Sequence, residues 1–371
     1  MTGKASVDDR GKVAVVLFNL GGPDCKEAIR PFLFNFFTDA NIIRLPFFLR
    51  YILARFIAYR RSKREAGESY GYLGNKSPLV DNSRQQARLL EDVLNQEQDK
   101  DRGIYKCFIC MRYWHPMAPQ VVREVRDWGA QRIVLLPLYP QYSTTTTYSS
   151  LGQWEKAALE AGMKDMPTFM TCCYPENDGF IKASTDHIMA CYEQALTDGY
   201  KKIRVLFSAH GLPERIIYQG DPYQYQCERS SRRIVKALSD RLDEQYGDQI
   251  KELDWQNCYQ SRVGPMKWIG PPVQYALERA ASDDCAVIIY PHAFTQEHVE
   301  TLVELDIEYK ELAKALGIKG YYRARTVSEH PAFIGGLSEI VLRSLQREGV
   351  QAEKQSCSCP EHYSRCCMRE A

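Results

Sequence analysis

The chain has 371 residues, of which 44% are hydrophobic and 26% are charged, and its formal net charge is +1. This length exceeds one average domain and favours two domains of comparable size. The near-neutral charge gives no reason to expect nucleic acid as a partner. The chain has no run of about 18 apolar residues, the length that would span a bilayer. Its first twelve residues lack the apolar core of a signal peptide. A cytoplasmic location is therefore expected.

Apolar, β-branched runs recur along the chain, and each is typical of a strand buried on both faces. These runs span residues 12–22, 105–114, 132–140, 168–175, 202–211, 253–261, 285–294 and 320–327. Amphipathic helical segments lie between them, so the alternation predicts right-handed βαβ units and an α/β fold. We expect two Rossmann-like domains, residues 1–180 and 181–350, each a four-stranded parallel sheet flanked by helices. A tail, 351–371, follows them.

The stretch "RVLFSAHGLPER" (204–215) places His210 where an apolar strand ends. Ligands of open α/β sheets bind outside the carboxyl ends of the strands. Gly211 and Pro213 force a turn directly after the histidine, which makes His210 a candidate site residue. A histidine that only satisfies the end of the sheet would show the same pattern. Neither GxGxxG nor GxxxxGK[ST] occurs, which argues against a nucleotide cofactor.

A helix is predicted over residues 295–317, and it would stack Glu300, Glu304 and Glu308 in one acidic row. Like charges at this spacing destabilise a helix, so the row needs a reason. It is either a solvated face or a path for cations or protons that leads to a buried carboxylate near His298 and Glu300. No CxxC…CxxC or HExxH pattern marks a zinc site.

The segment 42–64 is dense in Phe, Leu, Ile and Tyr and ends in the basic cluster "RRSKR". One interpretation is an ordinary core helix. The other is an exposed lip for a flat apolar ligand or for a membrane surface. In the second case the basic cluster would pair with carboxylates of the ligand or with lipid phosphate.

The chain has 13 cysteines, and most of them lie in apolar runs, where a thiol acts as a small hydrophobe. The polar tail is different, because it crowds four of them together: Cys357, Cys359, Cys366 and Cys367. Crowded thiolates in a reducing compartment indicate metal or iron–sulfur ligands before disulfides. The alternative is a tail without structure that carries incidental thiols.

Several motifs occur in one order between residues 12 and 345, among them "FNLGGP", "MRYWHP", "LYPQYS", "FSAHGLP", "GDPYQYQ", "YQSRVGPMKWIGP" and "HVETLVELDIEY". Together they resemble the ferrochelatase family, the terminal enzymes of haem synthesis. The resemblance implies a lyase that inserts Fe²⁺ into protoporphyrin IX, releases two protons, and encloses the porphyrin in a cleft between its domains. Three alternatives stay open: coproporphyrin III as the substrate, a sirohydrochlorin-type chelatase for Co²⁺ or Ni²⁺, and a porphyrin or haem carrier without turnover.

The resemblance also implies roles for individual residues. His210 and Glu300 match the family's active-site pair, which would accept and relay the protons and bind the entering metal. Other matching positions in the pocket and along the path to it are Leu20, Arg60, Arg61, Ser77, Arg112, Tyr113, Tyr139, Ser143, Trp268, His298, Glu304 and Glu308. Iron would enter past His210 and Glu300 or from the opposite side of the macrocycle. Residues 46–57 would form a lip that touches the inner face of the cytoplasmic membrane, as in a peripheral protein.

The tail departs from the family's eukaryotic pattern. There, one of the four cysteines that hold a [2Fe–2S] cluster lies just after the "YPQYS" motif, where this chain has Thr144. We therefore expect a [2Fe–2S] cluster held wholly by Cys357, Cys359, Cys366 and Cys367. A homodimer in which the tail packs across the subunit interface is a further expectation.

Overall fold

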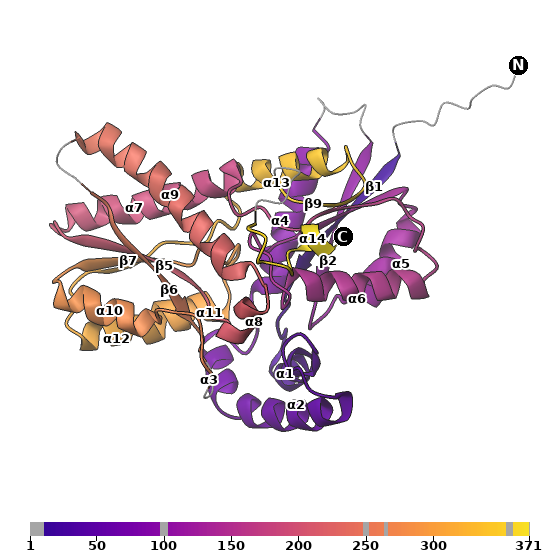
Figure 1. Cartoon of the computed structure of the whole chain (residues 1–371), viewed down its shortest axis with the longest axis horizontal. Coiled ribbons are helices and arrows are strands. Elements are labelled where there is room, and N and C mark those ends of the chain that lie inside the picture. Colours follow the sequence, from indigo (N-terminus) through magenta and orange to yellow (C-terminus); the bar gives the residue numbers. More distant parts are fainter. Residues whose placement is uncertain (1–10, 97–102, 248–251, 263–265, 354–358, 371) are drawn as a thin grey trace, which may run out of the picture.

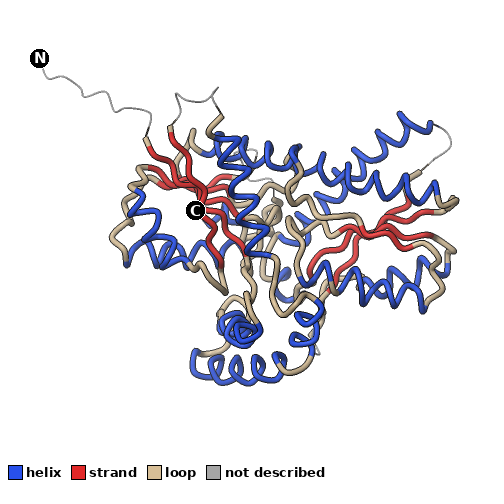
Figure 2. Tube along the Cα trace, turned by 180° about the vertical axis from the view of Figure 1, so that it is seen from behind, coloured by secondary structure: helices blue, strands red, loops and turns tan. Residues whose placement is uncertain are grey.

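The computed structural model describes residues 11–96, 103–247, 252–262, 266–353 and 359–370. Two parallel sheets lie side by side, and helices cover both faces of each sheet (Figures 1 and 2). The predicted α/β fold is therefore confirmed. All eight predicted strands are present, although each is shorter than its apolar run.

The first sheet has the strand order β2-β1-β3-β4-β9. Its strands are β1 (Lys12–Asn19), β2 (Ile104–Met111), β3 (Arg132–Pro137), β4 (Thr168–Thr171) and β9 (Gly349–Gln351). The prediction of four strands was wrong here, because β9 returns from the end of the chain and pairs with β4. The three residues of β9 do not lie in an apolar run, so their sequence does not predict a strand. They form one because β4 offers them backbone partners.

The second sheet has the predicted four strands in the order β6-β5-β7-β8. They are β5 (Ile203–His210), β6 (Asp254–Gln260), β7 (Ala286–Tyr290) and β8 (Tyr321–Arg323). All pairings in this sheet are parallel. The carboxyl ends of β5 and β6 therefore lie at one edge, where His210 is level with Gln260.

One hydrophobic core joins the two sheets. Val15 of β1 and Val205 of β5 belong to the same cluster of buried side chains, together with Phe180 and Phe333. The helices above this cluster are α4 (Leu79–Leu94), α7 (Asp178–Thr197), α9 (Tyr223–Tyr246) and α13 (Pro331–Ser344). The opposite faces are covered by α5 (Ala118–Trp128), α6 (Thr147–Glu160), α10 (Val273–Ser282) and α12 (Tyr309–Ala315). Because the core is continuous, the two sheets are held as one body.

A small helical lobe projects from the edge of the sheets (Figure 2). It consists of η1 (Lys26–Ala28), α1 (Ile29–Thr38), α2 (Phe47–Ser62) and α3 (Glu65–Tyr72). Two short helices, α8 (Glu214–Tyr218) and α14 (Cys367–Glu370), complete the structure near the middle of the molecule. No helix in the described ranges has the length and apolar character that crossing a bilayer requires.

The single helix predicted over residues 295–317 was wrong. The chain instead forms α11 (Val299–Leu302), the π-helical turn η4 (Glu304–Glu308) and α12. The amide of Glu308 donates to the carbonyl of Val303, a bond that widens the turn by one residue. The side chain of Glu304 is fixed by hydrogen bonds from outside the helix. The regular acidic row expected from a uniform helix is therefore interrupted. The domain limits at residues 180 and 350 stay a prediction.

The crossing of α7 and α13 requires glycine. A Cβ added at Gly336 would lie 2.3 Å from Oδ1 of Asn177 and 3.1 Å from the Cα of Gly179, whereas one added at Gly335 would meet nothing within 4 Å. Gly336→Ala should therefore destabilise the fold by about 1–3 kcal/mol. Gly335→Ala in the same helix is the matched control and should stabilise it by about 0.5–1 kcal/mol. Chemical denaturation of both variants measures the difference, and equal midpoints would contradict the close crossing.

Candidate active site

A small cavity of about 140 Å³ lies where the carboxyl ends of the two sheets meet. The first half of the chain contributes Leu20 after β1 and the loop after β3, and the second half contributes the end of β5 and the segment before α11. The predicted site residues that line this cavity are Leu20, Tyr139, Ser143, His210, His298 and Glu300. The fold thus brings six of them to one place.

His210 and Glu300 form a hydrogen-bonded pair in this cavity. Nδ1 of His210 lies 2.8 Å from Oε2 of Glu300, and the two side chains are 35% and 21% exposed. Burial alone would lower the pKa of His210, but the negative charge of Glu300 and its hydrogen bond outweigh burial and raise it. For Glu300, burial opposes ionisation, and the charge and hydrogen bond of His210 more than offset it, so the pKa of Glu300 is lowered.

The pair also fixes the histidine tautomer. An ionised carboxylate only accepts hydrogen bonds, so Nδ1 of His210 must carry a proton and donate it in the hydrogen bond to Glu300. In the neutral ring Nε2 is then the atom with a free lone pair. This is the arrangement of a general base that is oriented by a carboxylate.

His298 lies near the same carboxylate oxygen of Glu300. Its Nε2 is 4.0 Å from Oε2 of Glu300, and its side chain is only 7% exposed. Burial lowers the pKa of His298, so this ring is neutral near pH 7. The imidazoles of His210 and His298 therefore lie within 4.0 Å of one carboxylate oxygen, and His210 is the one hydrogen-bonded to it.

Glu304 occupies a different environment from Glu300. It accepts hydrogen bonds from Nε2 of Gln260 at 2.9 Å and from Oγ of Ser261 at 2.7 Å. Burial and the nearby charge of Glu300 raise the pKa of Glu304 to about 7. Gln260 also donates to the carbonyl oxygen of Glu300, at 2.8 Å, and so links the two glutamates. Glu308 follows at the exposed end of η4.

Arg112 and Tyr113 are hydrogen-bonded to a buried carboxylate and do not line the cavity. Nη2 of Arg112 and the hydroxyl of Tyr113 both donate to Oδ2 of Asp39, at 2.8 and 2.7 Å. Ser149 donates to the same oxygen. Burial of Asp39 opposes its ionisation, but the charge of Arg112 and these hydrogen bonds lower its pKa. Tyr113 is fully buried, and Arg112 lines a separate cavity of about 340 Å³.

The remaining predicted residues lie around the cavity and do not line it. Arg60 is exposed on α2, while the charge of Arg61 on the same helix acts on Glu300. Trp268 pairs its backbone with Pro213, just after β5. Ser77 is buried and faces a groove on another side of the first sheet.

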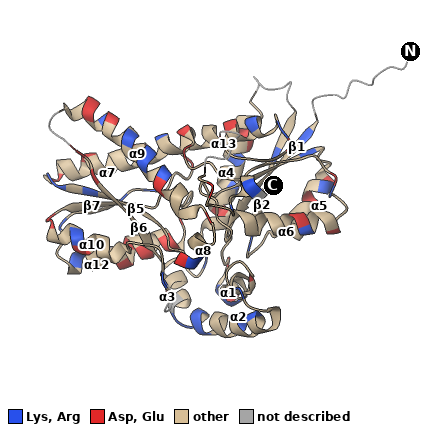
Figure 3. Ribbon diagram, in the orientation of Figure 1, with Lys and Arg blue, Asp and Glu red and all other residues tan. Residues whose placement is uncertain are grey.

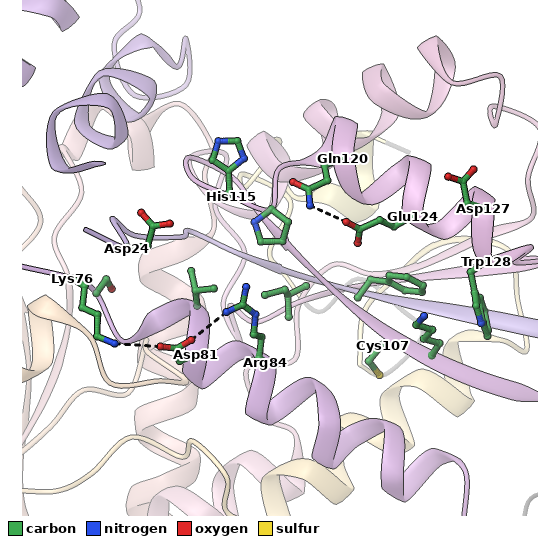
Figure 4. A pocket seen from close by; sticks show the side chains of 16 residues that line it. Asp24, Lys76, Asp81, Arg84, Cys107, His115, Gln120, Glu124, Asp127 and Trp128 are labelled. Atoms are coloured by element: carbon green, nitrogen blue, oxygen red, sulfur yellow. Dashed lines mark hydrogen bonds and ion pairs between the residues drawn. The ribbon is translucent and has the colours of Figure 1, made fainter. Parts of the chain in front are cut away.

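That groove, of about 790 Å³, is larger than the cavity and runs beside the edge strand β2 (Figure 4). Acidic and basic side chains both face it, and the carboxylate of Asp81 lies 3.8 Å from Lys76 and 3.2 Å from Arg84. Ser77 is the one predicted site residue in its lining. The candidate pair of His210 and Glu300 lies in the smaller cavity and not in this groove.

Three buried polar residues escaped the sequence analysis as parts of the site. Nδ2 of Asn19 donates to Oε1 of Gln296 at 3.0 Å, and Oδ1 of Asn19 accepts from the amide of Leu20 at 2.8 Å. Asp221, which is fully buried, accepts the hydroxyl of Ser143 at 2.9 Å. Asn19 did carry a signal, because it ends a strand. Asp221 carried one because it belongs to the "GDPYQYQ" motif, whereas Gln296 had none.

The described tail cysteines are buried against the rest of the chain. Nε2 of Gln226 lies 3.3 Å from Sγ of Cys359, and Cys367 lies against Cys172. Among the described residues, no group of three or more His, Cys, Asp or Glu side chains is arranged to hold a metal ion. Cys357 lies outside those residues. The described part of the tail therefore does not assemble the sulfur ligands of a [2Fe–2S] cluster, and the cluster stays a prediction.

Comparison with known proteins decides the family. A sequence model described as ferrochelatase matches residues 12–345. The chain belongs to the ferrochelatase family. The ferrochelatase of Wolbachia sp. subsp. Drosophila simulans (strain wRi) is 46% identical over 332 residues, which are 89% of this chain and 99% of the relative. That of Caulobacter vibrioides (strain NA1000 / CB15N) is 43% identical over 360 residues, which are 97% and 98% of the two chains.

Among solved structures, SirB from Bacillus subtilis with Fe³⁺ has a TM-score of 0.48 and 11% identity, and the match covers 90% of this chain and 94% of that one. The family assignment does not depend on this distant likeness. This ferrochelatase is a lyase of haem biosynthesis with Fe²⁺ as a substrate, which confirms the predicted activity. The sirohydrochlorin-type alternative is thereby set aside.

The His210–Glu300 pair can be tested by titration. In Glu300→Gln the charge that raises the pKa of His210 is lost while burial remains, so this pKa should fall below the ordinary value of about 6.5. Histidine NMR over pH 5–9 measures the shift. Glu311→Gln on the exposed side of α12 is the control and should leave His210 unchanged. An unchanged pKa in Glu300→Gln would contradict the coupling.

Proposed function

We propose that this ferrochelatase inserts Fe²⁺ into protoporphyrin IX. The support is the character of the cavity, whose lining is mainly apolar and aromatic and, among the described residues, includes no Lys or Arg. Buried carboxylates need cationic partners. A macrocycle with two propionates can keep both at the rim, near Arg60 and Arg61, and bury its apolar edge. Coproporphyrin III, with four propionates, would have to place some against apolar side chains.

The cavity must widen to take up a macrocycle. Its volume of about 140 Å³ is below the roughly 300–1,000 Å³ of pockets that enclose drug-sized ligands. Phe36 and Ile42 of the helical lobe form part of its wall. The lobe is therefore the part that would move outward, because the opposite wall consists of strand ends within the shared core.

His210 would accept the pyrrole protons. Its Nε2 holds the free lone pair in the neutral ring, and Glu300 stabilises the imidazolium that forms. Imidazole nitrogen and carboxylate oxygen are also suitable transient donors to Fe²⁺, which is a substrate here. Both groups face the cavity, so metal and porphyrin meet at the same pair.

The protons would leave through Glu304. A carboxyl group with a pKa of about 7 can take up and release a proton near neutral pH, which Glu300 cannot do with its lowered pKa. Gln260 holds Glu304 beside Glu300, because it donates to Oε2 of Glu304 and to the backbone carbonyl of Glu300, and the exposed Glu308 follows four residues after Glu304. The interrupted acidic row is thus a proton path.

Anaerobic chelation assays test this function. Wild-type protein should form haem from Fe²⁺ and protoporphyrin IX faster than from coproporphyrin III, and His210→Ala should reduce kcat by about 100-fold or more, as loss of a general base does. His187→Ala, a partly buried histidine on α7, is the control and should retain activity.

A preference for coproporphyrin III would overturn the proposed substrate and leave the base in place. Tight porphyrin binding without metal insertion by the wild type would indicate a carrier and contradict the enzymatic role. Full activity in His210→Ala would contradict the assignment of the base.

We also propose that the lip contacts a membrane surface that carries anionic lipids. Helix α2 leaves large apolar side chains in solvent: Phe47, Phe48, Ile52 and Phe56 are 60–65% exposed. The helix contains basic but no acidic residues (Figure 3). An apolar face with cationic neighbours is typical of a helix that lies in the interface of a bilayer.

Vesicle flotation tests this contact. Phe48→Ser combined with Ile52→Ser should weaken binding to vesicles of phosphatidylglycerol and phosphatidylcholine by about 10-fold or more, because two apolar anchors are lost. Leu159→Ser on α6, at a side chain 59% exposed, is the control. Equal flotation of all three proteins would contradict the proposed lip. The homodimer stays a prediction.

A further inference from the structure

The carboxyl-terminal segment 359–370 is folded onto the back of the porphyrin pocket, and we propose that it is a brace that holds the pocket in its binding shape. Asp221 and Gln226 would be the positioning residues that connect it to the pocket wall. The inference rests on the proposed porphyrin site and concerns a different part of the chain.

The segment forms a closed loop of its own. Nη2 of Arg369 donates to the carbonyl of Cys359 at 2.9 Å, and the amide of Cys366 donates to the carbonyl of Tyr363 at 3.0 Å. Cys359, Cys366 and Cys367 are 2–7% exposed. The brace therefore has a defined shape and can hold the residues that it contacts in place.

The first connection runs through Gly220 and Asp221. The amide of Arg365 donates to the carbonyl of Gly220 at 3.1 Å, and a Cβ at Gly220 would lie 2.4 Å from Oγ of Ser364. The next residue, Asp221, accepts from the amide and the hydroxyl of Thr144, both at 2.7 Å. It also accepts the hydroxyl of Ser143, which lines the cavity. Only one peptide bond separates the seat of the brace from the wall of the pocket.

The second connection runs through Gln226, which is 1% exposed. Its Nε2 contacts Sγ of Cys359 at 3.3 Å, and its Oε1 accepts the amide of Tyr142 at 2.8 Å. Tyr142 directly precedes Ser143. Both connections therefore meet at the same loop, residues 141–146, which supplies four residues to the cavity lining.

The same turn also reaches the lip. Gln219 accepts a hydrogen bond from Arg44, which precedes α2. Three successive residues, 219–221, thus contact the lip, the brace and the pocket wall. A shift of the brace against Gly220 would therefore displace both the lip and the pocket wall, which lie on the two sides of the porphyrin.

The test compares two glycines that share a backbone conformation. Gly220 has φ +96 and meets the brace, whereas Gly199 has φ +89 and open space around it. Gly220→Ala should speed hydrogen exchange in the peptide 359–371 and raise the Kd for protoporphyrin IX, measured by fluorescence, by about 10-fold, with kcat nearly unchanged. Gly199→Ala carries the same backbone strain and should change neither.

Arg369→Ala loosens the brace from its own exposed end, and so keeps the test open if Gly220→Ala folds poorly. It should raise exchange and Kd in the same direction. Faster exchange in either variant with a wild-type Kd would overturn the brace, as would unchanged exchange in Gly220→Ala. Wild-type protein that fails to bind protoporphyrin IX would instead contradict the proposed substrate.

Discussion

The site depends on buried hydrogen bonds between the halves of the molecule, among them the bond between Asn19 and Gln296, which lie 277 positions apart in the sequence. Both side chains are buried, so their amides must be paired, and each has a partner on the other half. Gln296 also accepts from Ser83 and donates to Gln86, both on α4. This network fixes the segment before α11 against the first sheet, and so sets the separation of Leu20 from His298 and Glu300.

With that separation fixed, burial and neighbouring charge drive the acidic groups apart in pKa. The charge of His210 keeps the pKa of Glu300 low, whereas burial and the charge of Glu300 raise the pKa of Glu304 to about 7, against the effect of its hydroxyl and amide donors. In the proposed function, two carboxylates with opposite pKa shifts divide the roles of orienting a base and carrying a proton. The π-helical turn assists, because Glu304 is held from β6 and the loop after it rather than by its own helix.

The sequence pattern predicted those features of the fold that neighbouring residues determine. The apolar runs marked eight strands, the glycine and proline after His210 marked a strand end, and the motif order indicated the family. Strand β9, the π-helical turn and Gln296 carry no such signal, because contacts with distant parts of the chain create them. Arg112 and Tyr113 are bound to the buried Asp39 and do not line the described cavity, and their place at the porphyrin stays a prediction.

The molecule thus combines a floor built on the shared core with a lip that leaves large apolar side chains exposed. The floor is made of strand ends on a core that runs through both sheets, and Asn19 and Gln296 are hydrogen-bonded to each other within it. The lip presents apolar side chains to solvent and contacts the turn at residues 219–221 through Arg44. In the proposed function, porphyrin entry would displace the lobe while His210 and Glu300 keep their geometry. If His210 accepts two pyrrole protons in turn, as we propose, its alignment has to be kept through both transfers, because each misalignment would slow proton transfer.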